Sequence, residues 1–199
     1  MIIEFYGLPG SGKTTAARRL CGATGRPLIS IQTRRELLAR AGRFLLRHPR
    51  YSLIALVYLI RYAGGWRLGY YKFMNCYLQA NAKYDKAGSY PQAVIDQGHF
   101  QNVLALFDRP LSAVKLSAYC RLLPRPDKLV VFSVPADVRS VRLAKRGHRS
   151  RDEFGEGHLQ AWQEAAEKND AAFRSLLPRL NIPYTVVATD ADLEKIISI

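Results

Sequence analysis

The sequence has few acidic residues, few cysteines and no long apolar run. Its 199 residues include 16 Asp and Glu against 30 Lys and Arg, a formal net charge of +14. The three cysteines, Cys21, Cys76 and Cys120, are far apart and lack partners at metal-ligand spacing, which favours reduced thiols over a disulfide scaffold or zinc site. No run approaches the roughly 18–20 apolar residues of a membrane-spanning helix. Met1 also leads straight into a strand-like segment without a leader, so we expect a cytoplasmic protein.

What the sequence does contain is enough apolar material for a core. Apolar residues make up 48% of the chain, and 11 Tyr, 8 Phe and 2 Trp add large side chains to bury. This composition argues against the disorder that a high net charge alone would suggest. At this length we expect one globular domain spanning residues 1–199.

Short apolar segments alternate with helical patterns along the chain. Strands are predicted at residues 2–6, 27–31, 93–96, 128–134 and 184–188. Helices are predicted at 13–23, 137–145, 159–177 and 190–197, with a longer helical stretch at 34–86 broken at His48-Pro49 and Gly64-Gly65. The alternation predicts an α/β fold, a doubly wound five-stranded parallel sheet, with residues 34–89 as a helical insert between the second and third strands.

The clearest motif is a phosphate-binding loop between the first strand and the first helix. Residues 7–14, GLPGSGKT, fit G-x-x-x-x-G-K-[ST] in full. Such a loop turns backbone N–H groups toward a phosphate, and the following helix adds its positive end. We expect ATP and Mg²⁺ here, with Lys13 on the β- and γ-phosphates and Thr14 as a magnesium ligand. The residues predicted to bind ATP are Gly7, Gly10, Ser11, Gly12, Lys13, Thr14, Thr15 and Arg142.

Two further features suit phosphoryl transfer. Asp96 ends an apolar strand, where an acidic group can hold a metal-bound water or accept a proton from the acceptor; the alternative is a structural turn residue. After the fourth strand, Arg139, Arg142 and Arg146 are spaced three and four apart on one helical face. The negative charge of a phosphoryl group during transfer would neutralise the positive charge of these arginines. The simpler interpretation is a basic helix face exposed to solvent.

The segments GLPGSGKTT, VIDQG and PDKLVVFSVPADVRSVRLAKRG together resemble the thymidylate kinase and deoxynucleoside kinase branch of P-loop kinases. The resemblance implies ATP, Mg²⁺ and a lid at residues 146–157. It matches Arg142 and Arg146 to the arginines at the base of the lid, places Arg149 and Arg151 within it, and makes Asp96 the Asp of a D-R motif. The predicted catalytic residues are therefore Lys13, Asp96, Arg142 and Arg146, with Thr14 and Asp96 holding magnesium.

The acceptor-binding elements depart from that family. Gln97 stands where an Arg would follow Asp96, and Thr33-Arg34 only weakly matches a T-R-E-P motif. We assign acceptor contacts to Arg34, Gln97, Phe100 and Gln101, while noting that Phe100 could instead belong to the core. These departures place thymidylate as the acceptor in doubt.

The insert is strongly basic and also apolar. Residues 34–72 hold nine basic side chains and one acid, Glu36, beside the apolar run 51–60 and Trp66. It could simply pack on the sheet with its arginines solvated, or it could contact an anionic membrane or a lipid-linked substrate. No nucleic-acid recognition motif is present, so nucleic acid is not expected as a partner.

Taken together, the sequence predicts an ATP-dependent kinase for a small-molecule acceptor, with a nucleoside or nucleoside monophosphate preferred. One alternative is a kinase of a sugar or lipid-linked glycan, peripheral to a membrane. Another is a nucleotide-binding switch or accessory ATPase. The sequence is also compatible with a homodimer.

Overall fold

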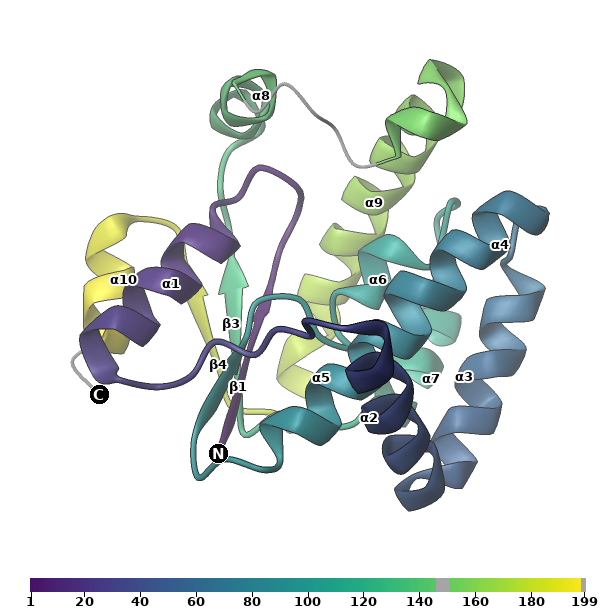
Figure 1. The fold of residues 1–199 in the computed structure, drawn as a ribbon. Helices are drawn as coiled ribbons and strands as arrows, with labels where there is room; N and C mark the ends of the chain where they lie inside the picture. Colours follow the sequence, from purple (N-terminus) through teal and green to yellow (C-terminus); the bar gives the residue numbers. More distant parts are fainter. Residues whose placement is uncertain (146–150, 198–199) are drawn as a thin grey trace.

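The computed structural model describes residues 1–145 and 151–197. Four parallel strands form one sheet: β1 (Ile2–Tyr6), β2 (Ala93–Ile95), β3 (Lys128–Phe132) and β4 (Tyr184–Val187). Their order is β2-β1-β3-β4, so β1, which precedes the loop at residues 7–14, is an inner strand (Figure 1). Each connection from one strand to the next runs through helices, as the pairing of parallel strands requires.

The prediction of five strands was wrong, because the described residues form four. Residues 27–31 reach the sheet edge but make only one isolated bridge, between Leu28 and Val94. Val94 N–H donates to the Pro27 carbonyl, and Ile29 N–H donates back to Val94. Pro27 has no N–H to extend this ladder, and β2 is only three residues long, so the pairing stops there.

Helices cover both faces of the sheet. On one face lie α1 (Lys13–Thr24) and α10 (Asp190–Ile197), packed on Ile3 and Phe5 of β1. On the other face lie α6 (Asn102–Ala105), α7 (Ala113–Leu122) and α9 (Glu156–Leu176), where Tyr6 meets Phe173 at 4.4 Å between ring centroids. The sequence analysis did not predict α7. A last helix, α8 (Ala136–Ala144), stands above the sheet after β3 (Figure 1).

The helical insert is present as predicted, with both breaks where they were expected. It comprises α2 (Arg34–Arg47), α3 (Pro49–Arg61), α4 (Trp66–Lys72), the π-helical segment η1 (Phe73–Leu78) and α5 (Gln79–Ala87). Pro49 occupies the first turn of α3, which needs no N–H donor there. Gly64 and Gly65 have φ values of 71° and 106°, which side chains rarely adopt, so they separate α3 from α4.

Part of the insert's positive charge is neutralised inside the insert. The carboxylate of Asp85, on α5, is almost fully buried and receives three arginines of α2. Arg47 lies 2.9 Å from it, Arg40 3.2 Å and Arg43 3.5 Å. This cluster fixes α2 against α5. Among the described residues, no helix is long and apolar enough to cross a bilayer.

Candidate active site

The loop at residues 7–14 follows the central strand and precedes α1, as predicted. Gly10 and Gly12 have φ values of 81° and 88°, in the left-handed region that favours glycine. A Cβ on Gly10 would lie 2.7 Å from the Arg139 carbonyl oxygen, and one on Gly12 would lie 3.3 Å from a guanidinium nitrogen of Arg142. A side chain on Gly10 would therefore collide with the backbone of α8, which lies close above the loop, and one on Gly12 would have to displace the Arg142 side chain slightly.

Lys13 is buried in the curve of this loop. Its ammonium donates to the Gly7 carbonyl at 2.5 Å and to the Leu8 carbonyl at 3.1 Å. A buried cation surrounded by glycine backbone, at the start of a helix, is a suitable environment for a phosphate group.

A second charged group stands at the end of β2. The Thr14 hydroxyl donates to Asp96 Oδ2 at 3.2 Å, and Lys83 Nζ lies 3.1 Å from Asp96 Oδ1. Lys83 comes from α5 of the insert and was not predicted as a site residue. No local pattern in the sequence points to it, because only the packing of α5 against β2 brings it to Asp96.

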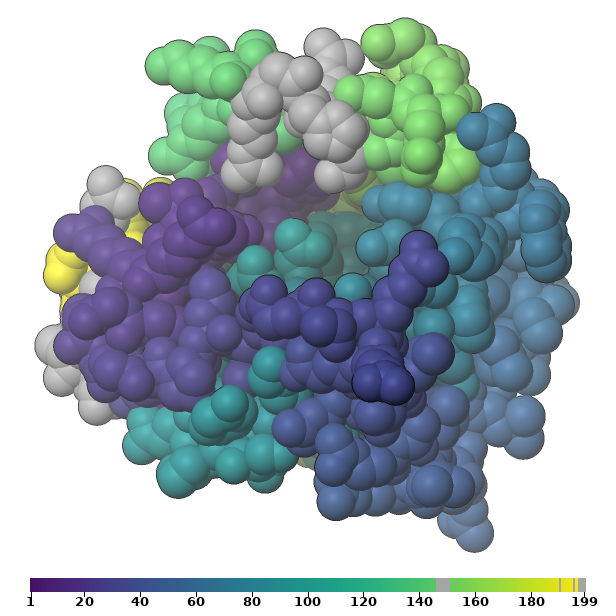
Figure 2. Space-filling view, viewed as in Figure 1, coloured from purple at the N-terminus to yellow at the C-terminus, as the bar shows by residue number. Residues whose placement is uncertain are grey.

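A cavity of about 350 Å³ opens beside this group, between the sheet and the insert. Lys83, Gln97 and Gln101 line it, together with Asn75 and Gln79 from the insert. None of its described lining residues is acidic. Figure 2 shows a hollow at the centre of this face, between the loop and α1 in purple and the insert in blue.

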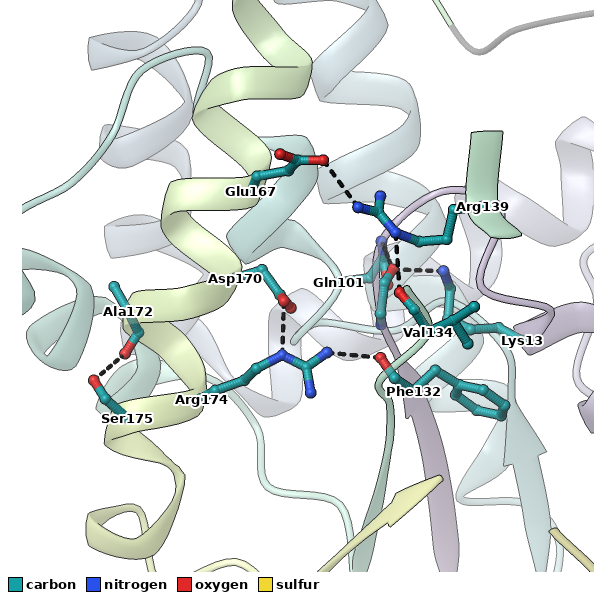
Figure 3. A network of polar contacts seen from close by, with 11 residues as sticks. Lys13, Gln101, Phe132, Val134, Arg139, Glu167, Asp170, Ala172, Arg174 and Ser175 are labelled. Carbon is teal, nitrogen blue, oxygen red and sulfur yellow. Dashed lines mark hydrogen bonds and ion pairs between the residues drawn. The ribbon is translucent and has the colours of Figure 1, made fainter. Parts of the chain in front are cut away.

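Gln101 connects this cavity to the loop. Its side-chain oxygen accepts from Gly7 N–H at 3.3 Å, and its nitrogen donates to the Gly7 carbonyl at 3.2 Å. Figure 3 shows Gln101 beside Lys13 at the end of β1. Gln97, Gln101 and Tyr71 also line the narrower cleft that contains the loop, so the cavity and the loop share one opening.

The other two residues assigned to the acceptor lie elsewhere. The Phe100 ring is fully buried and packs against Phe173, with 5.8 Å between ring centroids, because its segment turns inward toward α9. Phe100 therefore belongs to the core. Arg34 is exposed at the first residue of α2 and lines neither the cavity nor the cleft.

Beneath the cavity lies Glu4, which the sequence analysis missed. It is fully buried in β1 and accepts from Phe100 N–H at 2.6 Å and from the Tyr84 hydroxyl. Burial raises the pKa of its carboxyl from 4.5 to about 7. A Cβ on Gly98 would lie 2.5 Å from this carboxyl group. Glu4 thus holds the segment that carries Gln97 and Gln101; a carboxylate within the apolar run IIEFY was the signal for it.

On the opposite side of the loop is a second cavity, of about 590 Å³. Gly12, Thr15 and Arg142 line it, with Lys145 and Thr189. Arg139, on the same helix, turns away: it donates to Glu167 of α9 at 2.9 Å and to the Val134 carbonyl at 3.2 Å (Figure 3). Of the two described arginines expected on one face of α8, only Arg142 lies over the loop.

The predicted lid falls partly outside the described residues. Arg146 and Arg149 lie outside them. Arg151 is buried, with its guanidinium 2.5 Å from Asp108 and 4.5 Å from the centre of the Trp162 ring. It lines the cleft with the loop. Trp162 is buried in the core and donates its N–H to the Leu104 carbonyl.

No family model matches the sequence, and no curated protein sequence matches it. The fold is similar to that of solved deoxyadenosine kinases. The structure of deoxyadenosine kinase from M. mycoides with the products dCMP and a flexible dCDP is similar, with a TM-score of 0.57 and 15% identity over 100% of this chain and 95% of that one. The same enzyme with dATP gives 0.56 at 14% identity and 98% of its length, and with dCTP 0.54 at 13% and 97%, each over 100% of this chain. The resemblance predicted from the motifs is therefore confirmed at the level of fold.

Proposed function

We propose that the protein is an ATP-dependent phosphotransferase that moves the γ-phosphoryl group to a small acceptor, preferably a nucleoside or nucleoside monophosphate. The observation that carries the proposal is the pair of cavities on opposite sides of the Gly7–Thr14 loop. A donor in the larger cavity would place its terminal phosphate in the loop, and an acceptor in the smaller one would approach it past Gln101.

The residues of the loop fit a triphosphate with its metal. Thr14 and Asp96 offer a hydroxyl and a carboxylate 3.2 Å apart, the hard oxygen ligands that Mg²⁺ prefers. Among the described residues there is no cluster of three acidic, His or Cys ligands; magnesium held with a nucleotide needs only one or two protein carboxylates. When bound, the ion would neutralise phosphate charge. Lys13 and the loop N–H groups would orient the β- and γ-phosphates.

The cavity chemistry favours a phosphorylated acceptor over a plain hydroxyl. A hydroxyl needs a base, and the nearby described carboxylate, Asp96, is already shared between Thr14 and Lys83. A phosphate acceptor is ionised at neutral pH and needs a cation instead, which Lys83 supplies. For a nucleoside acceptor, Asp96 would have to leave its contact with Lys83 in order to accept the hydroxyl proton.

Two other functions are distinguishable from this one. A kinase of a sugar or lipid-linked glycan, acting in the cytoplasm near a membrane, would suit the basic and apolar insert. A nucleotide-binding switch would keep the loop but would not need arginines over the transferring group. Arg142, together with the predicted Arg146 and Arg149, favours transfer.

The test is replacement of Arg142 by Ala. Since Arg142 lies over the loop and also lines the donor cavity, we expect turnover to fall about 10²-fold or more while ATP affinity falls by a clearly smaller factor, about tenfold or less. Steady-state kinetics and calorimetry with ATP measure the two effects. Arg18→Ala, an exposed arginine of α1, is the matched control. Equal losses of turnover and affinity would point to a binding role instead.

A further inference from the structure

The outer surface of α3 is apolar where a surface helix is normally polar. Toward the core, α3 buries Ser52, Ala55 and Leu59. Toward solvent it presents Leu53, Val57 and Ile60, each more than half exposed. These three lie four and three residues apart and form one continuous stripe. The helix thus exposes larger aliphatic side chains than most of those it buries.

The next helix repeats this inversion. α4 buries Leu68 but also Lys72, which pairs with Asp108 and donates to the Tyr62 carbonyl, and it exposes Trp66 and Tyr70. Trp66 is 88% exposed. Trp and Tyr have an apolar ring with a polar edge, which suits the boundary between lipid and water.

Arginines border both helices. Arg50 and Arg61 lie at the two ends of α3, and Arg67 follows Trp66. Among the residues that the structure describes, none of these three has an ion pair with an acid. Between Glu36 and Asp85 the sequence contains no acidic residue at all. We call the surface the α3–α4 face: Leu53, Val57, Ile60, Trp66 and Tyr70, with Arg50, Arg61 and Arg67.

Of the partners that could cover this face, an anionic lipid surface fits best. A second copy of the chain would bring two predominantly basic surfaces together, since Arg50, Arg61 and Arg67 outnumber Glu153, which shares a pocket with Trp66 and Arg67, and like charges repel. A nucleic acid would pair with the arginines but would leave the aliphatic stripe in water. A bilayer with anionic headgroups satisfies both: aliphatic side chains enter the acyl boundary and the arginines meet the headgroups.

We propose that the α3–α4 face docks on anionic membranes. The two helices lie side by side at the end of the molecule away from α1 and α10 (Figure 1). Docking would therefore leave the larger cavity, beside α1, accessible from the aqueous side. Tyr71 of α4 lines the smaller cavity, so this cavity lies close to the docked surface.

The test is flotation of the purified full chain with vesicles of phosphatidylcholine alone or with about 30% phosphatidylglycerol. We expect binding to the anionic vesicles, weakened by salt. Val57→Asp should lower the partition coefficient at least tenfold. Val141→Asp is the matched control, because Val141 is a helical valine of nearly equal exposure, 54% against 56%, on α8. Arg61→Gln should cost about fivefold, and Arg18→Gln on α1 should cost clearly less.

Thermal melts show whether each variant is folded. A loss of binding counts only for a variant whose melting curve matches that of the wild type. The proposal is overturned if the protein fails to bind anionic vesicles or binds both compositions equally. Equal losses for Val57→Asp and Val141→Asp would also overturn it. Light scattering that shows a dimer dissociated by Val57→Asp would assign the face to a second copy instead. None of these results depends on catalysis, so the proposed kinase function is tested separately.

Discussion

Glu4 shows how one buried side chain sets both stability and site geometry. Its carboxyl group receives hydrogen bonds from the Phe100 backbone and the Tyr84 hydroxyl, so it joins β1, α5 and the segment after β2. Burial raises its pKa to about 7. The folded protein therefore binds a proton here that the unfolded chain releases near pH 4.5.

This pKa predicts a pH dependence of stability. Because the pKa is raised on folding, the contribution of Glu4 to stability falls as the pH rises from about 4.5 to about 7, by roughly 2–3 kcal/mol between pH 5 and 8. His99 acts in the opposite direction between about pH 3 and 6.5, since burial lowers its pKa from 6.5 to about 3. Glu4→Gln removes only the first effect.

Urea unfolding of the wild type and Glu4→Gln at pH 5 and pH 8 measures the difference. The stability of the variant relative to that of the wild type should rise by roughly 2–3 kcal/mol between pH 5 and pH 8, because Gln stays neutral while Glu4 ionises. A constant difference at both pH values would show that Glu4 is ionised throughout this range.

At the scale of elements, the segment between β2 and α6 depends on Gly98. A methyl group at this position would overlap the Glu4 carboxyl at 2.5 Å. We expect Gly98→Ala to destabilise the fold by about 2 kcal/mol and to raise the acceptor KM, since Gln97 and Gln101 flank it. Gly157→Ala, where a Cβ meets nothing within 4 Å, is the control and should be neutral or slightly stabilising. Equal stability of both variants would show that Glu4 moves aside at no cost.

The junction of α2 and α5 depends on Asp85. Because this carboxylate is buried and receives three arginines, Asp85→Asn should cost about 2 kcal/mol of unfolding free energy. The exposed pair between Arg19 and Glu194 is the comparison, and Glu194→Gln should cost less than about 1 kcal/mol. Denaturant unfolding measures both. A cost for Asp85→Asn no larger than that for Glu194→Gln would contradict this account of the junction.

Local sequence signals predicted the elements that depend on local chemistry. The glycines and Lys13 of the loop, Pro49 at the start of α3 and the apolar runs of β1 and β3 all specify their own conformation. The segment 27–31 failed because its pairing depends on the length of β2, a distant element. The π-helical turn of η1 was also not predicted. It depends on tertiary packing, because Asn75 and Cys76 of η1 line a cavity that other segments complete.

At the scale of the whole molecule, the site lies between the edge of the sheet and the insert. The loop and Asp96 come from the sheet, whereas Lys83, Asn75 and Gln79 come from the insert. Gln97 and Gln101 were predicted because they follow Asp96 in sequence. Lys83 was not, because only the packing of α5 on β2 brings it to Asp96. The fold, by contrast, follows from the order of strands and helices along the chain.

The most direct test of the proposed function is ATP consumption by the purified protein with Mg²⁺, measured against nucleosides, nucleoside monophosphates and sugars. We expect strong stimulation by a nucleoside monophosphate or a nucleoside. Lys13→Met should lower the acceptor-stimulated rate of ATP consumption by about 10²-fold or more. Lys168→Met, which changes an exposed lysine of α9, should leave this rate unchanged. Stimulation by sugars alone would reassign the acceptor. ATP binding with no stimulation by any acceptor would contradict the proposed phosphotransferase.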